Sequence, residues 1–113
     1  MTTETITDRK AAQPADLPEK IQHYINGQFV DSIDGDTFDV LDPVTNKPYI
    51  KAASGKKEDI EAAVKAAKEA FKNGPWPTML PRERARILTK IADIVESREQ
   101  VLAEIESYDS GLP

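Results

Sequence analysis

The chain has 113 residues and a mass of 12.5 kDa, which is enough for one small domain. Its 20 acidic and 15 basic residues give a formal net charge of −5, which argues against non-specific binding to nucleic acids or anionic membranes. With no cysteine and one histidine, disulfides, thiolate metal sites and Cys/His catalytic pairs are excluded. No apolar run approaches the roughly 18 residues of a membrane span, and we expect a cytoplasmic protein.

Residues 1–20 show no hydrophobic period and contain two prolines. Such a polar stretch cannot bury enough apolar surface to offset the entropy lost on ordering. We therefore predict a flexible N-terminal tail over 1–20 and a folded region over 21–113.

A β-hairpin is the first predicted element, over residues 23–30. Two short β-rich runs flank Asn26-Gly27. This pair accepts positive φ at both central positions of a type I′ turn, the turn that suits a two-stranded antiparallel ribbon. The alternation of a strand places Tyr24 and Ile25 on opposite faces.

Further extended segments are predicted up to residue 53. Asp34-Gly35-Asp36 is typical of a turn, and residues 37–41 then form a plausible strand. Residues 42–46 predict a second turn, because proline presets φ and the Asp and Asn side chains bond nearby backbone. Residues 49–53 complete the group of short strands.

A helix is predicted over residues 57–72, where the apolar period changes from two to about 3.6 residues. Asn73-Gly74 followed by Pro75 indicates its end. Its single apolar stripe is rich in alanine and consists of Ile60, Ala63, Val64, Ala67, Ala70 and Phe71.

Two more helices are predicted beyond the stiff linker at residues 75–77. Pro81 suits the first position of a helix, where its missing N–H costs little. The residues after it form a broad apolar face, rich in isoleucine. Ser97 and Gln100 match a capping box, so we place a break at Glu96–Ser97 and begin the third helix there.

The predicted architecture is α/β, with short β-strands and a hairpin followed by three α-helices. No repeat is present. Since two-stranded hairpins are marginal alone, these elements need a surface to pack against. One alternative is a stand-alone helical protein-interaction module that binds a partner through its alanine-rich and isoleucine-rich faces.

Few polar residues are candidates for chemistry. The five glycines are too far apart for a phosphate-cradling loop. Asp31, Asp34, Asp36 and Asp39 lack the terminal glutamate and glycine position of a calcium loop, which favours a solvated hairpin loop. The arginines of residues 82–86 are interpreted as a solvated face with local ion pairs rather than a phosphate site.

Two single residues deserve separate interpretation. His23 lies beside a predicted strand, and a surface or packing role is favoured. Asp109 follows the third helix, where the helix dipole disfavours a carboxylate. Either a hydrogen bond to local backbone in a turn or a nearby cation would explain Asp109.

An ordered set of stretches extends over residues 21–113. The stretches are Tyr24-Ile25-Asn26-Gly27 with Phe29-Val30, then 37–45, 53–54, 58–67, Phe71, Trp76 to Pro81, 82–88 and 106–113. In this order and spacing they resemble the N-terminal part of the NAD(P)-dependent aldehyde dehydrogenase superfamily. No single stretch is specific, but their order and spacing together are.

The resemblance implies that residues 21–113 are the N-terminal portion of a nucleotide-binding domain, incomplete without the remainder of the dehydrogenase chain. The complete enzyme would use NAD or NADP to oxidise an aldehyde or semialdehyde to a carboxylic acid through a thioester. It would act as a dimer or tetramer. The glycine-bearing nucleotide turn, the general-base glutamate and the nucleophilic cysteine would lie downstream, so the chain alone is expected to be inactive.

The resemblance also implies a structural monovalent cation, K⁺ or Na⁺. Backbone oxygens of Val40 and Leu41 and the side chain of Asp109 would bind it. The ending Asp-Ser-Gly-Leu-Pro at residues 109–113 is similar to the branch that oxidises 5-carboxymethyl-2-hydroxymuconate semialdehyde, an intermediate of aromatic catabolism.

Overall fold

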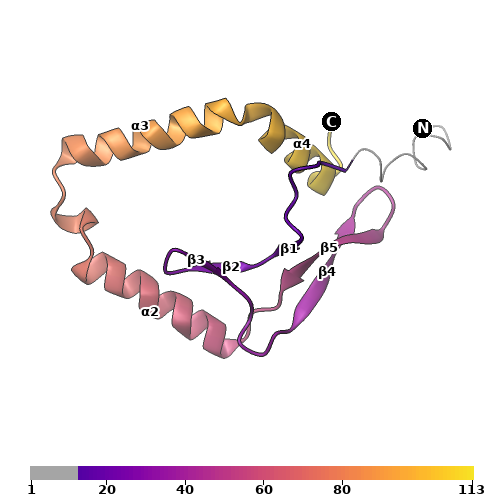
Figure 1. Cartoon of the computed structure of the whole chain (residues 1–113), viewed down its shortest axis with the longest axis horizontal. Helices are drawn as coiled ribbons and strands as arrows, with labels where there is room; N and C mark the ends of the chain where they lie inside the picture. The colour runs from indigo at the N-terminus through magenta and orange to yellow at the C-terminus, as the bar shows by residue number, and fades with distance from the viewer. Residues whose placement is uncertain (1–12) are drawn as a thin grey trace.

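The computed structural model describes residues 13–113 (Figure 1). Most of the predicted tail, residues 1–12, lies outside the described residues. The last residue of that predicted tail, Lys20, belongs to strand β1 (Lys20–Ile21), which pairs in parallel with β5 (Lys47–Ala53). Within residues 13–113, β1 is therefore the first regular element.

The hairpin consists of β2 (His23–Ile25) and β3 (Gln28–Val30), which pair antiparallel. Asn26 and Gly27 have φ of 52° and 76°, so both central turn residues are left-handed, as the sequence predicts.

A second sheet has three strands in the order β1-β5-β4. β4 (Thr37–Asp42) pairs antiparallel with β5, and the register shifts between Val40 and Leu41. The turn before β4 is closed by a hydrogen bond of 2.8 Å from the amide of Gly35 to the carbonyl of Ser32. Positive φ at Gly35 and Asn46 allows the chain to reverse at either end of β4.

Three helices follow the strands: α2 (Lys57–Asn73), α3 (Pro81–Ser97) and α4 (Glu99–Ser110). A short 3₁₀ helix, η1 (Trp76–Thr78), connects α2 to α3. α2 ends at Asn73, one residue beyond the predicted range, and α3 begins at Pro81 as predicted. Among residues 13–113, no helix is long and apolar enough to cross a membrane.

The predicted capping box at Ser97 and Gln100 is wrong. Ser97 is the last residue of α3, and its hydroxyl donates to the carbonyl of Ile94 over 2.7 Å. The side chain of Gln100 bonds that of Glu104 instead of the backbone. A helical serine can bond a carbonyl of its own preceding turn, and this contact competes with capping the next helix.

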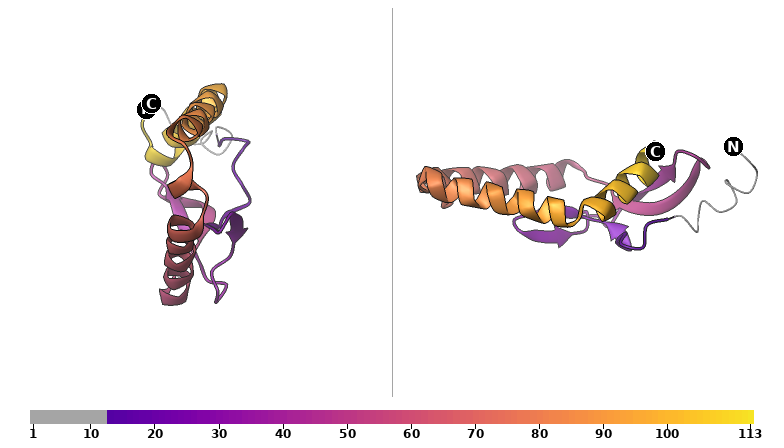
Figure 2. Two further views of the ribbon diagram at one scale, coloured as in Figure 1. Left: turned by 90° about the vertical axis from the view of Figure 1, so that its left-hand side faces the viewer. Right: turned by 90° about the horizontal axis from the view of Figure 1, so that it is seen from above.

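The arrangement is open (Figures 1 and 2), with η1 at one end of the long axis and α4, β4 and β5 at the other. The radius of gyration is 18.4 Å, against about 13 Å for a compact domain of about 100 residues. Among the described residues, the buried apolar side chains are those of Ile50, Ala52 and Tyr108. Large apolar side chains are exposed on α2 and α3, namely Ile60, Val64, Phe71, Ile87, Leu88, Ile91, Ile94 and Val95.

Candidate functional site

The junction of α4 with the sheet brings Asp109 to the strand pair that carries Val40 and Leu41. Val40 pairs with Ile50 and Leu41 with Pro48, so the register skips Tyr49 at this step. The hydroxyl of Tyr49 donates a hydrogen bond to Oδ1 of Asp109 over 2.5 Å. The contact of Asp109 is therefore with a distant strand, rather than with the local backbone considered above.

The surrounding contacts hold the last turn of α4 in place. The rings of Tyr49 and Tyr108 meet edge-on, with centroids 5.1 Å apart, and Tyr108 is buried. Gly111 has φ of 75°, and a methyl group on it would lie 3.0 Å from Cγ of Pro43. The helix end is thus packed against both β5 and the turn after β4.

Two carboxylates, those of Asp109 and Asp42, act on Tyr49 at the junction. Burial, followed by the hydrogen bond to Asp109 and the charges of Asp109 and Asp42, raises the pKa of Tyr49 to about 12. Asp42 is buried, and its Oδ1 accepts a hydrogen bond of 2.9 Å from the amide of Val44. The carbonyls at the end of α4 add partial negative charge.

The predicted cation ligands fit a hard monovalent ion in the chemistry of their donors. Two backbone carbonyls, of Val40 and Leu41, and the carboxylate of Asp109 supply only oxygen, which such cations prefer. Within residues 13–113, no cluster of three or more His, Cys, Asp or Glu side chains could hold a metal ion. Backbone oxygens would therefore have to supply much of the coordination.

The acidic loop forms ion pairs. Nζ of Lys56 lies 3.2 Å from Oδ2 of Asp34 and 2.9 Å from Oδ2 of Asp36. Lys20 pairs with Asp31 and Lys51 with Asp39. Each of these four aspartates thus has a lysine partner, in agreement with the interpretation as a solvated loop.

His23 is half-buried, and no hydrogen-bond partner contacts its buried Nε2 among the described residues. Its ring lies against Gly55, on which a methyl group would be 3.4 Å from Cε1 of the imidazole. This placement supports the predicted packing role.

The arginines at the start of α3 do not form the predicted ion pairs. Arg82 and Arg86 are exposed, and among residues 13–113 no ion pair joins them to Glu83. Arg82 and Arg86 lie on the solvated face that the sequence predicts, whereas Arg84 is half-buried.

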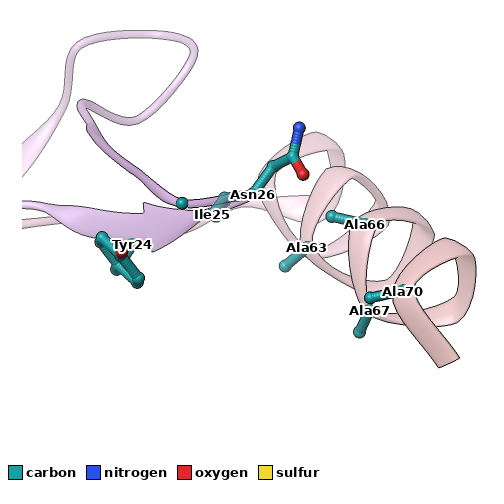
Figure 3. A pocket seen from close by; sticks show the side chains of 8 residues that line it. Tyr24, Ile25, Asn26, Ala63, Ala66, Ala67 and Ala70 are labelled. Carbon is teal, nitrogen blue, oxygen red and sulfur yellow. The ribbon is translucent and has the colours of Figure 1, made fainter. Parts of the chain in front are cut away.

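An open groove of about 330 Å³ lies between the hairpin turn and α2 (Figure 3). The sequence predicts the alanine-rich stripe of α2, but not the hairpin as its neighbour. The lining residues are Tyr24, Ile25, Asn26, Gly27, Ala63, Ala66, Ala67 and Ala70.

Comparison with known proteins gives one consistent relationship. The aldehyde dehydrogenase family matches residues 29–113. Aldehyde dehydrogenase 1 of Tanacetum cinerariifolium is 48% identical over 90 residues, which are 80% of this chain and 18% of the relative. Aldehyde dehydrogenase family 2 member B4, mitochondrial, of Arabidopsis thaliana is 50% identical over 92 residues, 81% of this chain and 17% of the relative.

The fold is similar as well. The NAD⁺ complex of an aldehyde dehydrogenase from Bacillus cereus superimposes with a TM-score of 0.77 at 36% identity, covering 96% of this chain and 21% of that one. The chain spans less than a fifth of the length of the two curated relatives above. Its strands and three helices match the N-terminal part of such a domain, so the predicted fold class is confirmed. The chain belongs to the aldehyde dehydrogenase family.

Proposed function

We propose that this chain is the N-terminal segment of an NAD(P)-dependent aldehyde or semialdehyde dehydrogenase and forms part of its nucleotide-binding domain. The complete enzyme would oxidise an aldehyde to a carboxylic acid through a thioester, with NAD as hydride acceptor. The observation that carries this proposal is the similarity to the NAD⁺ complex of the Bacillus cereus enzyme over 96% of the chain.

The exposed apolar faces support the proposal that this chain is one segment of a larger protein. Val64 on α2 is 57% exposed and Ile91 on α3 is 51% exposed, although both lie on stripes that the sequence patterns for burial. Apolar surface on this scale marks an interface with further protein. We propose that the remainder of the dehydrogenase chain covers these faces, in an enzyme that is a dimer or tetramer.

The chain by itself is proposed to be inactive. It contains no cysteine, so a thioester cannot form on it, and its glycines are too widely spaced for a phosphate-binding turn. Residues elsewhere in the enzyme would bind NAD. A stand-alone interaction module is not favoured, because the family match spans residues 29–113.

A structural cation is the one bound group that we assign to this segment. The carbonyls of Val40 and Leu41 and the carboxylate of Asp109 would hold K⁺ or Na⁺. The ion would offset the charge of Asp109 beside the negative end of α4.

The substrate class is proposed from the ending at residues 109–113, whose similarity is to the 5-carboxymethyl-2-hydroxymuconate semialdehyde branch. A cytoplasmic enzyme of aromatic catabolism would fit that substrate. The complete enzyme's turnover of this semialdehyde, compared with its turnover of a simple aliphatic aldehyde, would test the assignment. A preference of the complete enzyme for the aliphatic aldehyde would contradict it.

A chimera tests the main proposal. Residues 21–113 would replace the matching segment of the Bacillus cereus enzyme, and NADH formation would be followed with several aldehydes. We expect the chimera to fold and turn over substrate, while the isolated chain gives no NADH above background. A cysteine-free chain that reduced NAD with an aldehyde would refute the claim of inactivity, and an insoluble chimera would count against the assignment of the segment.

Matched variants show whether the proposed faces mediate the assembly. Val64→Asp places a charge on the apolar stripe of α2 and should abolish folding of the chimera. Lys65→Asp introduces the same residue one position along, at an exposed polar site, and should be tolerated. Equal behaviour of the two variants would contradict the docking role of this face.

A further inference from the structure

We infer that Tyr49 is the positioning residue that orients the Asp109 carboxylate toward a monovalent cation at the junction of α4 with the sheet. This inference rests on the cation site of the proposed function. It adds a residue that sequence reasoning did not assign to that site, and it begins from the hydrogen bond of 2.5 Å between the Tyr49 hydroxyl and Oδ1 of Asp109.

The strand register places Tyr49 where its hydroxyl can reach Asp109. Because Val40 pairs with Ile50 and Leu41 with Pro48, Tyr49 is the residue of β5 that the register skips. A skipped residue of this kind bends its strand and re-aims its side chain. Tyr49 therefore reaches Asp109 from the same step of the sheet that carries the two carbonyls proposed as ligands.

Packing limits the positions open to the phenol ring. Tyr49 is half-buried, and the ring of Tyr108 meets it edge-on at 5.1 Å. The helix end is fixed by the close approach of Gly111 to Pro43. A hydroxyl held by a packed ring limits the orientations of the carboxylate that it contacts through Oδ1, and a further ligand would meet the carboxylate in one of those orientations.

The charges around Asp109 favour a cation as that ligand. Among residues 13–113, no lysine or arginine pairs with Asp109. The carbonyl groups at the end of α4 add partial negative charge beside Asp109. Asp109 is exposed, so a monovalent cation can reach its carboxylate and compensate the charge, which a neutral hydroxyl does not.

Hydrogen–deuterium exchange on the full 113-residue chain tests the inference without any activity readout. The amides of α4 would be followed in KCl, NaCl and choline chloride at equal ionic strength. We expect slower exchange in at least one alkali salt than in choline chloride. In Tyr49→Phe, the difference in exchange rate between choline chloride and the alkali salt should fall by about tenfold. A change of this size corresponds to the loss of one hydrogen bond to a charged group.

Control variants separate positioning from simple packing. Tyr24→Phe removes a hydroxyl from an exposed tyrosine and should keep the full salt difference. Asp109→Asn keeps an oxygen that can accept from Tyr49 but removes the charge, and it should abolish the salt difference while α4 stays protected in choline chloride.

Several outcomes would overturn the inference. Tyr49→Phe could accelerate exchange equally in all three salts, which is the result expected of a merely structural contact. It could also increase the difference between the salts, which would mean that the tyrosine and the ion compete for Asp109. A salt difference that survives in Asp109→Asn would exclude this carboxylate as ligand. If the unsubstituted chain responded alike to all three salts, or showed no protection in α4, both the cation site and the role of Tyr49 would fail, while the chimera assay would still decide the enzymatic assignment.

Discussion

The carboxylate of Asp59 accepts a hydrogen bond from the backbone amide of Ile33 through Oδ1, over 2.9 Å. Its Oδ2 accepts a second bond of 2.9 Å from the amide of Lys56. One side chain, 5% exposed, thus caps α2 and holds the loop before β4. The loop in turn presents Ile33 with 69% of its surface exposed.

The link between Asp59 and Ile33 should depend on pH. The amide of Lys56, then that of Ile33 and the charge of His23, hold the pKa of Asp59 below its usual value. Since the folded-state pKa is depressed, the stabilisation is present above the unfolded value of about 3.9 and is lost as the pH falls through the folded pKa. The amide resonance of Ile33 should therefore shift with a midpoint below about pH 3.9. Asp59→Asn should abolish this titration, whereas Asp93→Asn on α3 should leave it intact; a midpoint at or above the unfolded value would contradict the assignment.

Tyr49 should ionise well above the ordinary range of a tyrosine side chain. Its pKa is raised from 10.0 to about 12, chiefly by burial and then by Asp109. A raised folded-state pKa means that the stabilisation is complete below the unfolded value of about 10 and declines as the pH rises toward 12. Tyrosinate absorbance should show a group that ionises near pH 12, and Tyr49→Phe should remove it. If that group persisted in Tyr49→Phe, it would be evidence against the assignment to Tyr49 and its hydrogen bond with Asp109.

Gly74 should resist substitution for a steric reason. Its φ of −75° is open to any residue, but a methyl group there would lie 2.3 Å from the carbonyl oxygen of Ala70. Gly74→Ala should cost about 1–3 kcal/mol, as overpacking does, and fray the last turn of α2. The matched control Gly55→Ala meets only His23, at an ordinary contact distance of 3.4 Å. Urea unfolding of the chimera would compare them, and equal free energies of unfolding would contradict the steric argument.

Charged substitutions on the apolar faces should affect the isolated chain and the assembled enzyme in opposite ways. In the isolated chain, Val64→Asp with Ile91→Asp should change stability by only about 0.5 kcal/mol each, because both positions are exposed. They should also reduce self-association and dye binding, which sedimentation and fluorescence would measure. The same pair should prevent folding of the chimera. A large loss of structure in the isolated chain would show that these side chains already pack within it.

Local sterics explain what could be predicted from sequence. Asn26-Gly27 adopts positive φ whatever surrounds it, since few other pairs tolerate a type I′ turn. Pro81 begins α3 because proline cannot continue a helix from within. The family assignment also came from sequence, through ordered short stretches over residues 21–113, and the match to residues 29–113 confirms it.

The error at Ser97 shows where local rules end. The residue satisfies the pattern of a capping box, yet its hydroxyl bonds Ile94 within α3. Two local hydrogen bonds of similar strength were available to it. The path of the backbone at Arg98, between α3 and α4, decided which of the two hydrogen bonds formed.

Composition and pattern by themselves determined the hairpin turn, the helices and the surplus of apolar surface in this chain, because each depends on residues that are neighbours in sequence. The tertiary structure alone decided that Tyr49 contacts Asp109, 60 residues away, and that Asp59 holds Ile33, 26 residues away. Such pairs depend on strand register and on the direction in which a helix leaves the sheet. Those features arise from the summed packing of distant segments, which no local spacing encodes.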